Sequence, residues 1–148
     1  MKLSTRGRYG TRLMVELTKH YGQGPVSISE ISKSQNIPAK YLEQLIIPLK
    51  RANLIRSVRG PKGGHMLAKS PTEIKLWDLL VLLESKFSFV DCLVDKDACG
   101  NAETCPVRPV WGRALEAMMQ VFRETTLLDI IGKSQDPPEK RSQEAQAS

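Results

Sequence analysis

The feature that most constrains the fold is the run of glycines with a proline at residues 60–64, which separates two short apolar segments. Residues 54–59 and 65–68 are strand-like in composition, and a connection of this kind is typical of a hairpin with a mobile tip. A phosphate-binding loop is the alternative for these glycines, but no Lys-Ser or Lys-Thr pair that opens a helix follows them. The sequence therefore predicts one small β-hairpin.

Three helical segments precede the hairpin. Ser4 can cap the first, in which apolar residues recur every four positions. The second begins at a capping box at residues 27–30 and ends before Asn36, which is a turn residue. Pro38 is well placed to open the third helix, but Pro48 lies inside it and would remove one backbone hydrogen bond, so we expect a kink or an early end there. Three helices followed by a basic hairpin describe a winged helix-turn-helix.

The chain beyond the hairpin changes character twice. A second capping box at residues 70–73 predicts a fourth helix that covers the core. Residues 86–108 have no amphipathic period and contain every cysteine, so we expect an irregular functional loop. Pro109 then opens a long amphipathic helix, which is a natural dimer element, although packing onto its own domain is the alternative. Its apolar stripe consists of Trp111, Leu115, Met118 and Phe122, and residues 126–129 can cap one more turn before Gly132.

Charge is distributed unevenly along the 148 residues. Residues 1–70 carry 13 Lys and Arg against 3 Asp and Glu, whereas residues 71–148 carry 9 against 13. A basic half favours a polyanionic partner such as double-stranded DNA, and a merely solvated basic surface is the alternative. No apolar run approaches the roughly 20 residues of a membrane span, and the first residues do not lead into the apolar core of a signal peptide. We therefore expect a cytoplasmic protein without a membrane partner.

These patterns predict a mainly α fold with a small β-hairpin: a winged helix-turn-helix plus a long C-terminal dimerisation helix. The expected parts are a DNA-binding domain at residues 1–84, a cysteine loop at 85–108, a dimerisation helix at 109–132 and a disordered tail at 133–148. The tail is polar and contains two prolines, which is typical of a segment that cannot bury enough apolar surface to fold.

All three cysteines, Cys92, Cys99 and Cys105, lie in one 14-residue window. An odd number in an intracellular chain argues against a disulfide framework. The gaps of six and five residues do not match structural zinc sites, where two cysteines usually lie about two to four residues apart. An iron–sulfur cluster is larger, and a loop with Gly100 and Asn101 between the ligands can wrap it. Three thiolates leave a fourth position for an acidic residue of the loop, a partner subunit or a small thiol.

Several segments together resemble one known family. They are the opening residues 1–9, the helix segment 41–45, the wing at 57–61 with the glycines that follow it, and the three-cysteine loop. Over residues 1–132 the chain is similar to the IscR-like (Rrf2) family of bacterial winged-helix iron–sulfur transcription regulators. The resemblance implies a homodimer in which the cluster state selects the promoters that are bound.

Carried over by position, the resemblance places Lys40, Glu43 and Gln44 on a recognition helix in the major groove. Lys40 replaces the serine of the nearest family member, so base preference is expected to differ. The Glu43 carboxylate accepts from cytosine and repels phosphate, so we hypothesise that it vetoes wrong sequences until a cluster binds; unchanged sequence preference in Glu43→Ala would refute this. The expected DNA contacts, on the helix-turn-helix and on a wing in the minor groove, are Ser27, Lys40, Tyr41, Glu43, Gln44, Arg56, Arg59, Gly60, Pro61 and Lys62.

The cysteine loop departs from the family pattern in two ways. Arg108 occupies the position of the histidine that is the fourth ligand in IscR-like proteins, and arginine does not ligate iron. The first gap between cysteines is also one residue longer. We expect Cys92, Cys99 and Cys105 to hold an iron–sulfur cluster, two-iron (2Fe-2S) rather than four-iron, whose unusual ligation suits a sensor of cluster, iron or redox status. The alternatives are a thiol or zinc switch without a cluster and, in another class, an electron carrier or enzyme, for which no catalytic constellation is present.

Overall fold

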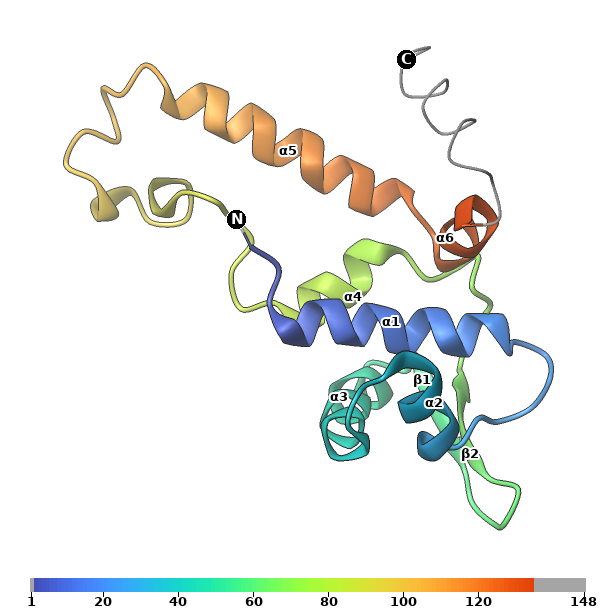
Figure 1. Cartoon of the computed structure of the whole chain (residues 1–148). Helices are drawn as coiled ribbons and strands as arrows, with labels where there is room; N and C mark the ends of the chain where they lie inside the picture. The colour runs from blue at the N-terminus through green and yellow to red at the C-terminus, as the bar shows by residue number, and fades with distance from the viewer. Residues whose placement is uncertain (1, 135–148) are drawn as a thin grey trace.

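The computed structural model describes residues 2–134, which form a winged helix-turn-helix body with a long helix, α5, on the far side of α4 (Figure 1). In chain order the elements are α1 (Thr5–Lys19), α2 (Ile28–Gln35), α3 (Ala39–Arg51), β1 (Ile55–Val58), β2 (Gly64–Leu67), α4 (Leu76–Leu83), the 3₁₀ turns η1 (Asp91–Leu93) and η2 (Lys96–Ala98), α5 (Arg108–Glu124) and α6 (Leu127–Ser134). Helices α2, α3, α4 and α6 all contact α1, and α5 packs against α4. The predicted mainly α fold with one small hairpin is confirmed.

The starts of the first two helices follow from their capping residues. The Ser4 hydroxyl accepts a hydrogen bond from the Gly7 amide at 3.0 Å at the start of α1. At the start of α2 the Ser27 hydroxyl accepts from the Glu30 amide at 3.2 Å, and the Glu30 carboxylate accepts from the Ser27 amide at 3.0 Å. Asn36 adopts the left-handed conformation, with φ of 52° and ψ of 49°, and turns the chain toward α3. The predicted capping box and turn are confirmed.

Helix α3 differs from its prediction at both ends. Pro38 precedes the helix as its N-cap instead of opening it, and the helix continues through Pro48 to Arg51. The predicted early end at Pro48 is therefore wrong. Proline removes only its own N–H, so the loss is confined to one backbone hydrogen bond. The last turn is held in the core by Leu45 and Leu49, which are both buried.

Strands β1 and β2 form the antiparallel hairpin that the glycine-rich segment predicts. Ile55 pairs with Leu67 at its base. Two backbone hydrogen bonds of 2.8 Å between Val26 and His65 join the hairpin to the entry of α2. Gly64 permits this close approach, because a Cβ at that position would lie 2.3 Å from the Val26 carbonyl oxygen. The wing is thus fixed to the helix-turn-helix at its base.

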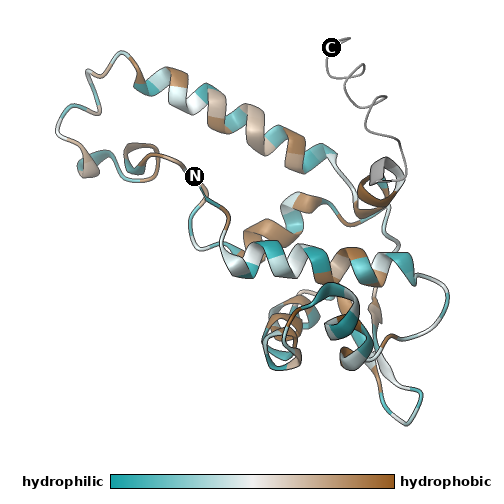
Figure 2. Ribbon diagram, viewed as in Figure 1, coloured by the Kyte–Doolittle hydropathy of each residue, from teal (hydrophilic) through white to brown (hydrophobic). Residues whose placement is uncertain are grey.

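One apolar core joins α1, α2, α3, α4 and the base of the hairpin. Leu13 and Met14 of α1, Leu42 of α3 and Leu79 of α4 are fully buried within it. Leu127, at the start of α6, is buried in the same core. Figure 2 shows α4 as a mostly apolar ribbon, which agrees with its contacts to α1 on one side and α5 on the other.

Helix α4 begins later than the capping box at residues 70–73 predicts. The chain before it is extended because it pairs with the segment between α5 and α6, where the Leu76 amide donates to the Thr125 carbonyl at 2.8 Å. The helix starts at Leu76, and the Asp78 carboxylate accepts from the Lys75 amide at 3.0 Å. The predicted start is wrong because this long-range pairing overrides the local capping signal.

The predicted C-terminal helix, residues 109–132, is two helices. Helix α5 ends at Glu124, and a new cap follows: the Thr126 amide donates to the Asp129 carboxylate at 2.8 Å, and the Asp129 amide donates to the Thr126 hydroxyl at 3.0 Å. Helix α6 then packs against α1, whereas no residue of α5 is buried in the described chain. Helix α5 therefore remains the candidate dimer element.

The predicted disordered tail, residues 133–148, lies almost entirely outside the described residues. Its first two residues form the end of α6. Within residues 2–134, no helix combines the length and apolarity that crossing a bilayer requires.

Candidate DNA interface and cysteine loop

Helices α2 and α3 and the hairpin lie on the side of α1 that faces away from α5 (Figure 1). The two faces of α3 differ: Leu42 and Leu45 are buried, whereas Lys40, Glu43 and Gln44 are exposed. The N-terminal half of α3 therefore presents a charged and polar face to solvent. In a helix-turn-helix this second helix is the one that enters the major groove.

Two further residues of the predicted interface have structural contacts of their own. Ser27 caps α2, and its amide lowers the pKa of the Glu30 carboxyl by hydrogen bonding to the charged form. Tyr41 is half-buried, and its ring meets that of Tyr9 in α1 edge-on with the centroids 5.7 Å apart. Ser27 and Tyr41 therefore each hold a helix in place, Ser27 at the start of α2 and Tyr41 between α3 and α1.

The wing is uniformly basic. Between Glu43 and Glu73 the chain contains no acidic residue. The predicted wing residues are all exposed: Arg56, Arg59, Gly60, Pro61 and Lys62. A stretch with positive charges only is suited to the phosphates of a duplex, because no carboxylate repels the backbone.

His65 holds the base of the wing. Its Nδ1 lies 2.9 Å from the Ser57 hydroxyl across the hairpin. Burial lowers the pKa of His65, and the positive charge of Lys50 lowers it further. The ring is therefore neutral at pH 7, and no additional charge is enclosed at the base of the wing.

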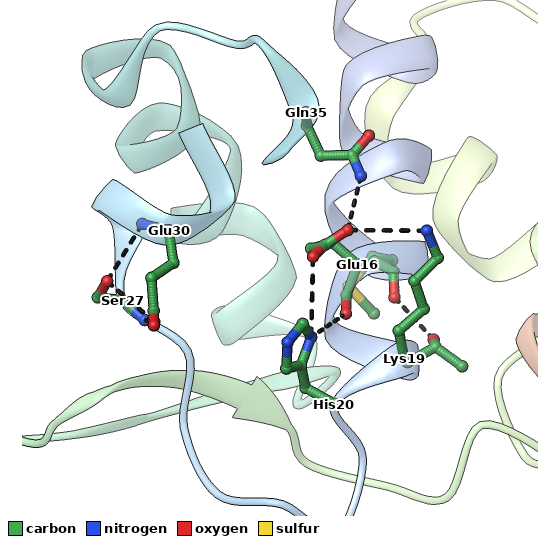
Figure 3. Close-up of polar contacts among 8 residues, drawn as sticks. Glu16, Lys19, His20, Ser27, Glu30 and Gln35 are labelled. Atoms are coloured by element: carbon green, nitrogen blue, oxygen red, sulfur yellow. Dashed lines mark hydrogen bonds and ion pairs between the residues drawn. The ribbon is translucent and has the colours of Figure 1, made fainter. Parts of the chain in front are cut away.

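Figure 3 shows a polar cluster that sequence analysis missed. Glu16 of α1 is buried, and its carboxylate accepts a hydrogen bond from the side-chain amide of Gln35 at 2.7 Å. Gln35 is the last residue of α2, so this contact ties the helix-turn-helix to α1. The available signal was an acidic residue that helical periodicity places beside Leu13 and Leu17 on the apolar side of α1.

The cysteine loop connects α4 to α5. Cys92 lies in η1, Cys99 follows η2, and Cys105 lies shortly before α5. All three are free thiols; Cys99 is exposed and the other two are half-buried. Nowhere in the described part of the chain do three His, Cys, Asp or Glu side chains lie close enough together to hold one metal ion. The predicted ligands therefore share one loop without being gathered at one point.

Arg108 closes the loop at its base. Its guanidinium donates two hydrogen bonds to the Cys92 carbonyl, from Nε at 3.2 Å and from Nη2 at 3.1 Å. The position of the family's fourth ligand is thus taken by a cation that holds the backbone of the first cysteine. Three thiolates suit iron–sulfur chemistry in kind. Their separation, with arginine in the fourth position, does not fit a cluster in this arrangement.

Aromatic contacts fix the start of the loop to the two flanking helices. The Phe87 ring lies edge-on to Trp77 of α4 at 5.0 Å and to Phe122 of α5 at 5.9 Å. Phe89 meets Trp111 of α5 at 5.9 Å. No residue of η1, of η2 or of the segment between them is buried. The loop is therefore anchored where it leaves α4, while η1, η2 and the segment between them have no buried residue.

Over residues 3–133 the sequence matches the family described as "Rrf2: Iron-dependent Transcriptional regulator". The chain belongs to the Rrf2 family. The HTH-type transcriptional regulator CymR of Bacillus subtilis (strain 168) is 39% identical over 130 residues, which are 88% of this chain and 89% of that relative. The solved structure of CymR (YrzC), described as the global cysteine regulator of B. subtilis, has a TM-score of 0.77 at 38% identity and covers 90% of this chain and 98% of its own. The structure of T. potens IscR has a TM-score of 0.71 at 36% identity, with coverages of 91% and 89%.

These likenesses confirm the resemblance to IscR-like regulators and the winged-helix fold. The Rrf2 chain is a transcriptional regulator and not an enzyme. Regulators of this family bind DNA and are typically dimeric. The relatives include both IscR and a cysteine regulator, so family membership leaves the chemistry of the cysteine loop open.

Proposed function

We propose that this Rrf2 regulator binds double-stranded DNA as a homodimer and that its cysteine loop carries the signal that controls binding. The observation that carries the DNA interface is the exposed face shared by α3 and the acid-free wing. Between Glu43 and Glu73 this stretch holds six Lys and Arg residues. They are Lys50, Arg51, Arg56, Arg59, Lys62 and Lys69.

The side chains of α3 match base edges of the major groove. Lys40 donates to guanine oxygen and nitrogen acceptors, and Gln44 has the donor and acceptor pair that recognises adenine. Glu43 accepts a hydrogen bond from the cytosine amino group and repels phosphate, so it disfavours binding of α3 at other base sequences or against the DNA backbone. On the wing, Arg59 is suited to a minor groove and Lys62 to a phosphate. Together these residues form an interface that both positions the duplex and reads it.

A second copy of the chain is proposed to cover the apolar side of α5. Trp111 and Val121 of this helix are exposed. A hollow of about 360 Å³ lies between α1, α4 and α5. Its apolar lining includes Leu3, Tyr9, Leu76, Leu80 and Phe122. A two-fold dimer formed here is expected to prefer a pseudo-palindrome with half-sites about one helical turn apart.

The cysteine loop is the proposed sensor because its start is fixed to α4 and α5 while none of its three cysteines is buried. An iron–sulfur cluster, two-iron by the family resemblance, requires the loop to close until Cys92, Cys99 and Cys105 share one site with a fourth ligand. A thiol switch is the second candidate, and it is favoured by the cysteines as they stand here, free and separate. The likeness to CymR, a cysteine regulator in B. subtilis, supports this candidate.

Selection from a pool of random duplexes tests the DNA interface. We expect the protein to enrich a pseudo-palindrome and to bind it with an affinity that falls steeply with salt, because phosphate contacts release counterions. Failure to enrich any sequence, or binding that does not respond to salt, would contradict the proposed interface.

Anaerobic purification distinguishes the two sensing chemistries. About two iron and two acid-labile sulfide per chain, lost in a Cys92/Cys99/Cys105→Ala variant, would establish the two-iron cluster. A protein that stays colourless after anaerobic reconstitution with iron and sulfide would exclude the cluster and leave the thiol switch.

A further inference from the structure

Glu16 is a buried carboxylate that the proposed DNA contacts do not use. Only 6% of its surface is exposed. Its nearest basic groups are Lys19 Nζ at 3.9 Å and His20 Nδ1 at 3.8 Å, both too far for a hydrogen bond (Figure 3). Burying a carboxylate costs free energy, and an apolar side chain of similar size would avoid that cost. Stability alone therefore does not account for a glutamate here.

The short contact of this carboxylate is to Gln35. Gln35 Nε2 donates to Glu16 Oε2 at 2.7 Å. Arg12, one turn earlier in α1, holds the other polar atoms of the same glutamine: its Nε donates to Gln35 Oε1 at 3.2 Å, and its Nη2 donates to the Gln35 carbonyl oxygen. Two side chains of α1 thus occupy both ends of the Gln35 amide and its backbone carbonyl. The last residue of α2 is therefore fixed in both side-chain rotamer and backbone position.

Gln35 immediately precedes the turn of the helix-turn-helix. Asn36 follows it in the left-handed conformation, and α3 begins at Ala39. Within the turn, the Ile37 amide donates to the Ser32 carbonyl at 3.2 Å, and the Ser32 hydroxyl donates to the Ile37 carbonyl at 2.7 Å. Because this connection is short and internally bonded, a displacement of Gln35 is passed on to the direction in which α3 leaves the turn.

Arg12 also reaches the recognition helix by a second route. Its guanidinium lies 5.5 Å from the centroid of the Tyr9 ring. That ring in turn meets Tyr41 in the first turn of α3. The same arginine therefore contacts the residue before the turn and an aromatic pair that ends on the helix after it.

We propose that Glu16 and Arg12 are positioning residues for DNA recognition. Their hydrogen bonds from α1 hold Gln35 and so set the orientation of α3 relative to the wing. That orientation in turn determines how strongly the protein prefers its operator over other DNA. Neither residue needs to touch a base for this effect. The inference rests on the proposed DNA binding and adds to it the residues that orient the reading helix.

Three substitutions isolate the contribution of Glu16. Glu16→Met removes the acceptor and fills the space with apolar atoms, whereas Glu16→Gln keeps an acceptor oxygen for Gln35 and removes the charge. Lys19→Met is the matched control, because Lys19 lies beside the same carboxylate without contacting Gln35. For each full-length variant, we would measure the Kd for the duplex that wild type enriches and for a scrambled duplex of equal length, at one salt concentration. Melting by circular dichroism identifies a temperature at which every variant is folded.

We expect Glu16→Met to lower the ratio of specific to non-specific affinity about tenfold, comparable with one mismatched base pair, while Glu16→Gln and Lys19→Met stay within about twofold of wild type. Gln35→Leu should show at least this loss, because it removes the side-chain contacts with both Glu16 and Arg12. Adding Glu16→Met to Gln35→Leu should cause no further loss, because the contact between Glu16 and Gln35 is already gone. If Glu16→Met does not fold, the specificity ratio of Gln35→Leu tests the positioning role in its place.

Two outcomes would overturn the positioning role. One is an unchanged ratio in folded Glu16→Met or Gln35→Leu, with only the melting temperature reduced. The other is a loss that Glu16→Gln fails to restore. Failure of wild type to enrich any duplex is a different result, because it refutes the proposed DNA binding itself.

Discussion

The winged-helix region and the cysteine loop of this chain are organised in opposite ways. In the first, helices begin at side-chain caps and a single core holds every element from α1 to α4. In the second, two single 3₁₀ turns follow the aromatic anchors Phe87 and Phe89, and Ala102 is its only buried residue within the described chain. A rigid reading unit beside a loosely packed segment is what a regulator requires if a signal is to rearrange one part without unfolding the other. The contrast predicts that equivalent substitutions have unequal effects in the two regions.

The largest expected effect is on stability. Leu13→Ala removes a fully buried side chain from the core and should lower the free energy of unfolding by about 2–5 kcal/mol. Val94→Ala truncates a loop side chain that is 61% exposed, and the change should stay within about 0.5 kcal/mol. Urea denaturation of both variants provides the comparison. Similar losses in the two variants would mean that the loop is packed as firmly as the core.

Glycine substitutions sharpen the comparison at the backbone. Gly64→Ala places a Cβ 2.3 Å from the Val26 carbonyl oxygen, and we expect a loss of about 1–3 kcal/mol as the wing base shifts. Gly100→Ala between two cysteines meets no atom within 4 Å and should leave stability unchanged. Thermal melts of both variants, monitored by circular dichroism, measure the difference. A stable Gly64→Ala protein would show that the wing is not fixed to the entry of α2.

Charge removal separates the DNA-binding surface from the loop. Lys62→Ala should lower the slope of log affinity against log salt by about one unit, because one phosphate contact is lost. Lys96→Ala removes an equally exposed charge from the cysteine loop and should leave the slope unchanged. Fluorescence anisotropy with the selected duplex over a salt series gives both slopes. A reduced slope in Lys96→Ala would place the loop on the DNA.

The smallest expected effect is a pH dependence at the base of the wing. Because burial lowers the pKa of His65 in the folded chain, the unfolded chain binds more protons between the ordinary value of 6.5 and the lowered one. Stability should therefore fall as the pH drops through this window and should remain lower below it. Denaturation of wild type and His65→Gln between about pH 7.5 and pH 5.5 isolates this contribution as the difference between the two curves. Parallel curves would show that His65 does not titrate as its burial predicts.

Local sequence patterns predicted the winged-helix region well because its helices and strands begin and end at capping and turn residues close in sequence. The capping box at Ser27, the turn at Asn36 and the glycine-rich hairpin each act within a few residues, and each is found in the structure. The predicted end at Pro48 was wrong because burial of the surrounding leucines offsets the free-energy cost of the lost hydrogen bond. This burial depends on tertiary packing, which a local sequence pattern does not describe. Periodicity also predicted the stripe on α5, and the capping signal at residues 126–129 predicted the helical turn that follows it.

Features that depend on distant parts of the chain could not be predicted. The start of α4 is set by pairing with Thr125, about 50 residues later in the chain. The hydrogen bond between Glu16 and Gln35 joins α1 to α2, which lie apart in the sequence. The three cysteines were found by their spacing, but spacing does not say where each thiol lies. The contact of Arg108 with the Cys92 carbonyl likewise appears only when the loop is seen closed at its base.

The most direct test of the link between the two regions is the DNA affinity of one protein in two states of its cysteines. Wild type and the Cys92/Cys99/Cys105→Ala variant would be compared on the selected duplex, first reduced and metal-free, then after anaerobic reconstitution or thiol oxidation. We expect the Kd of wild type to change in at least one treated state and that of the variant to stay constant. Equal affinities for wild type in every state would contradict control of the winged helix by the cysteine loop.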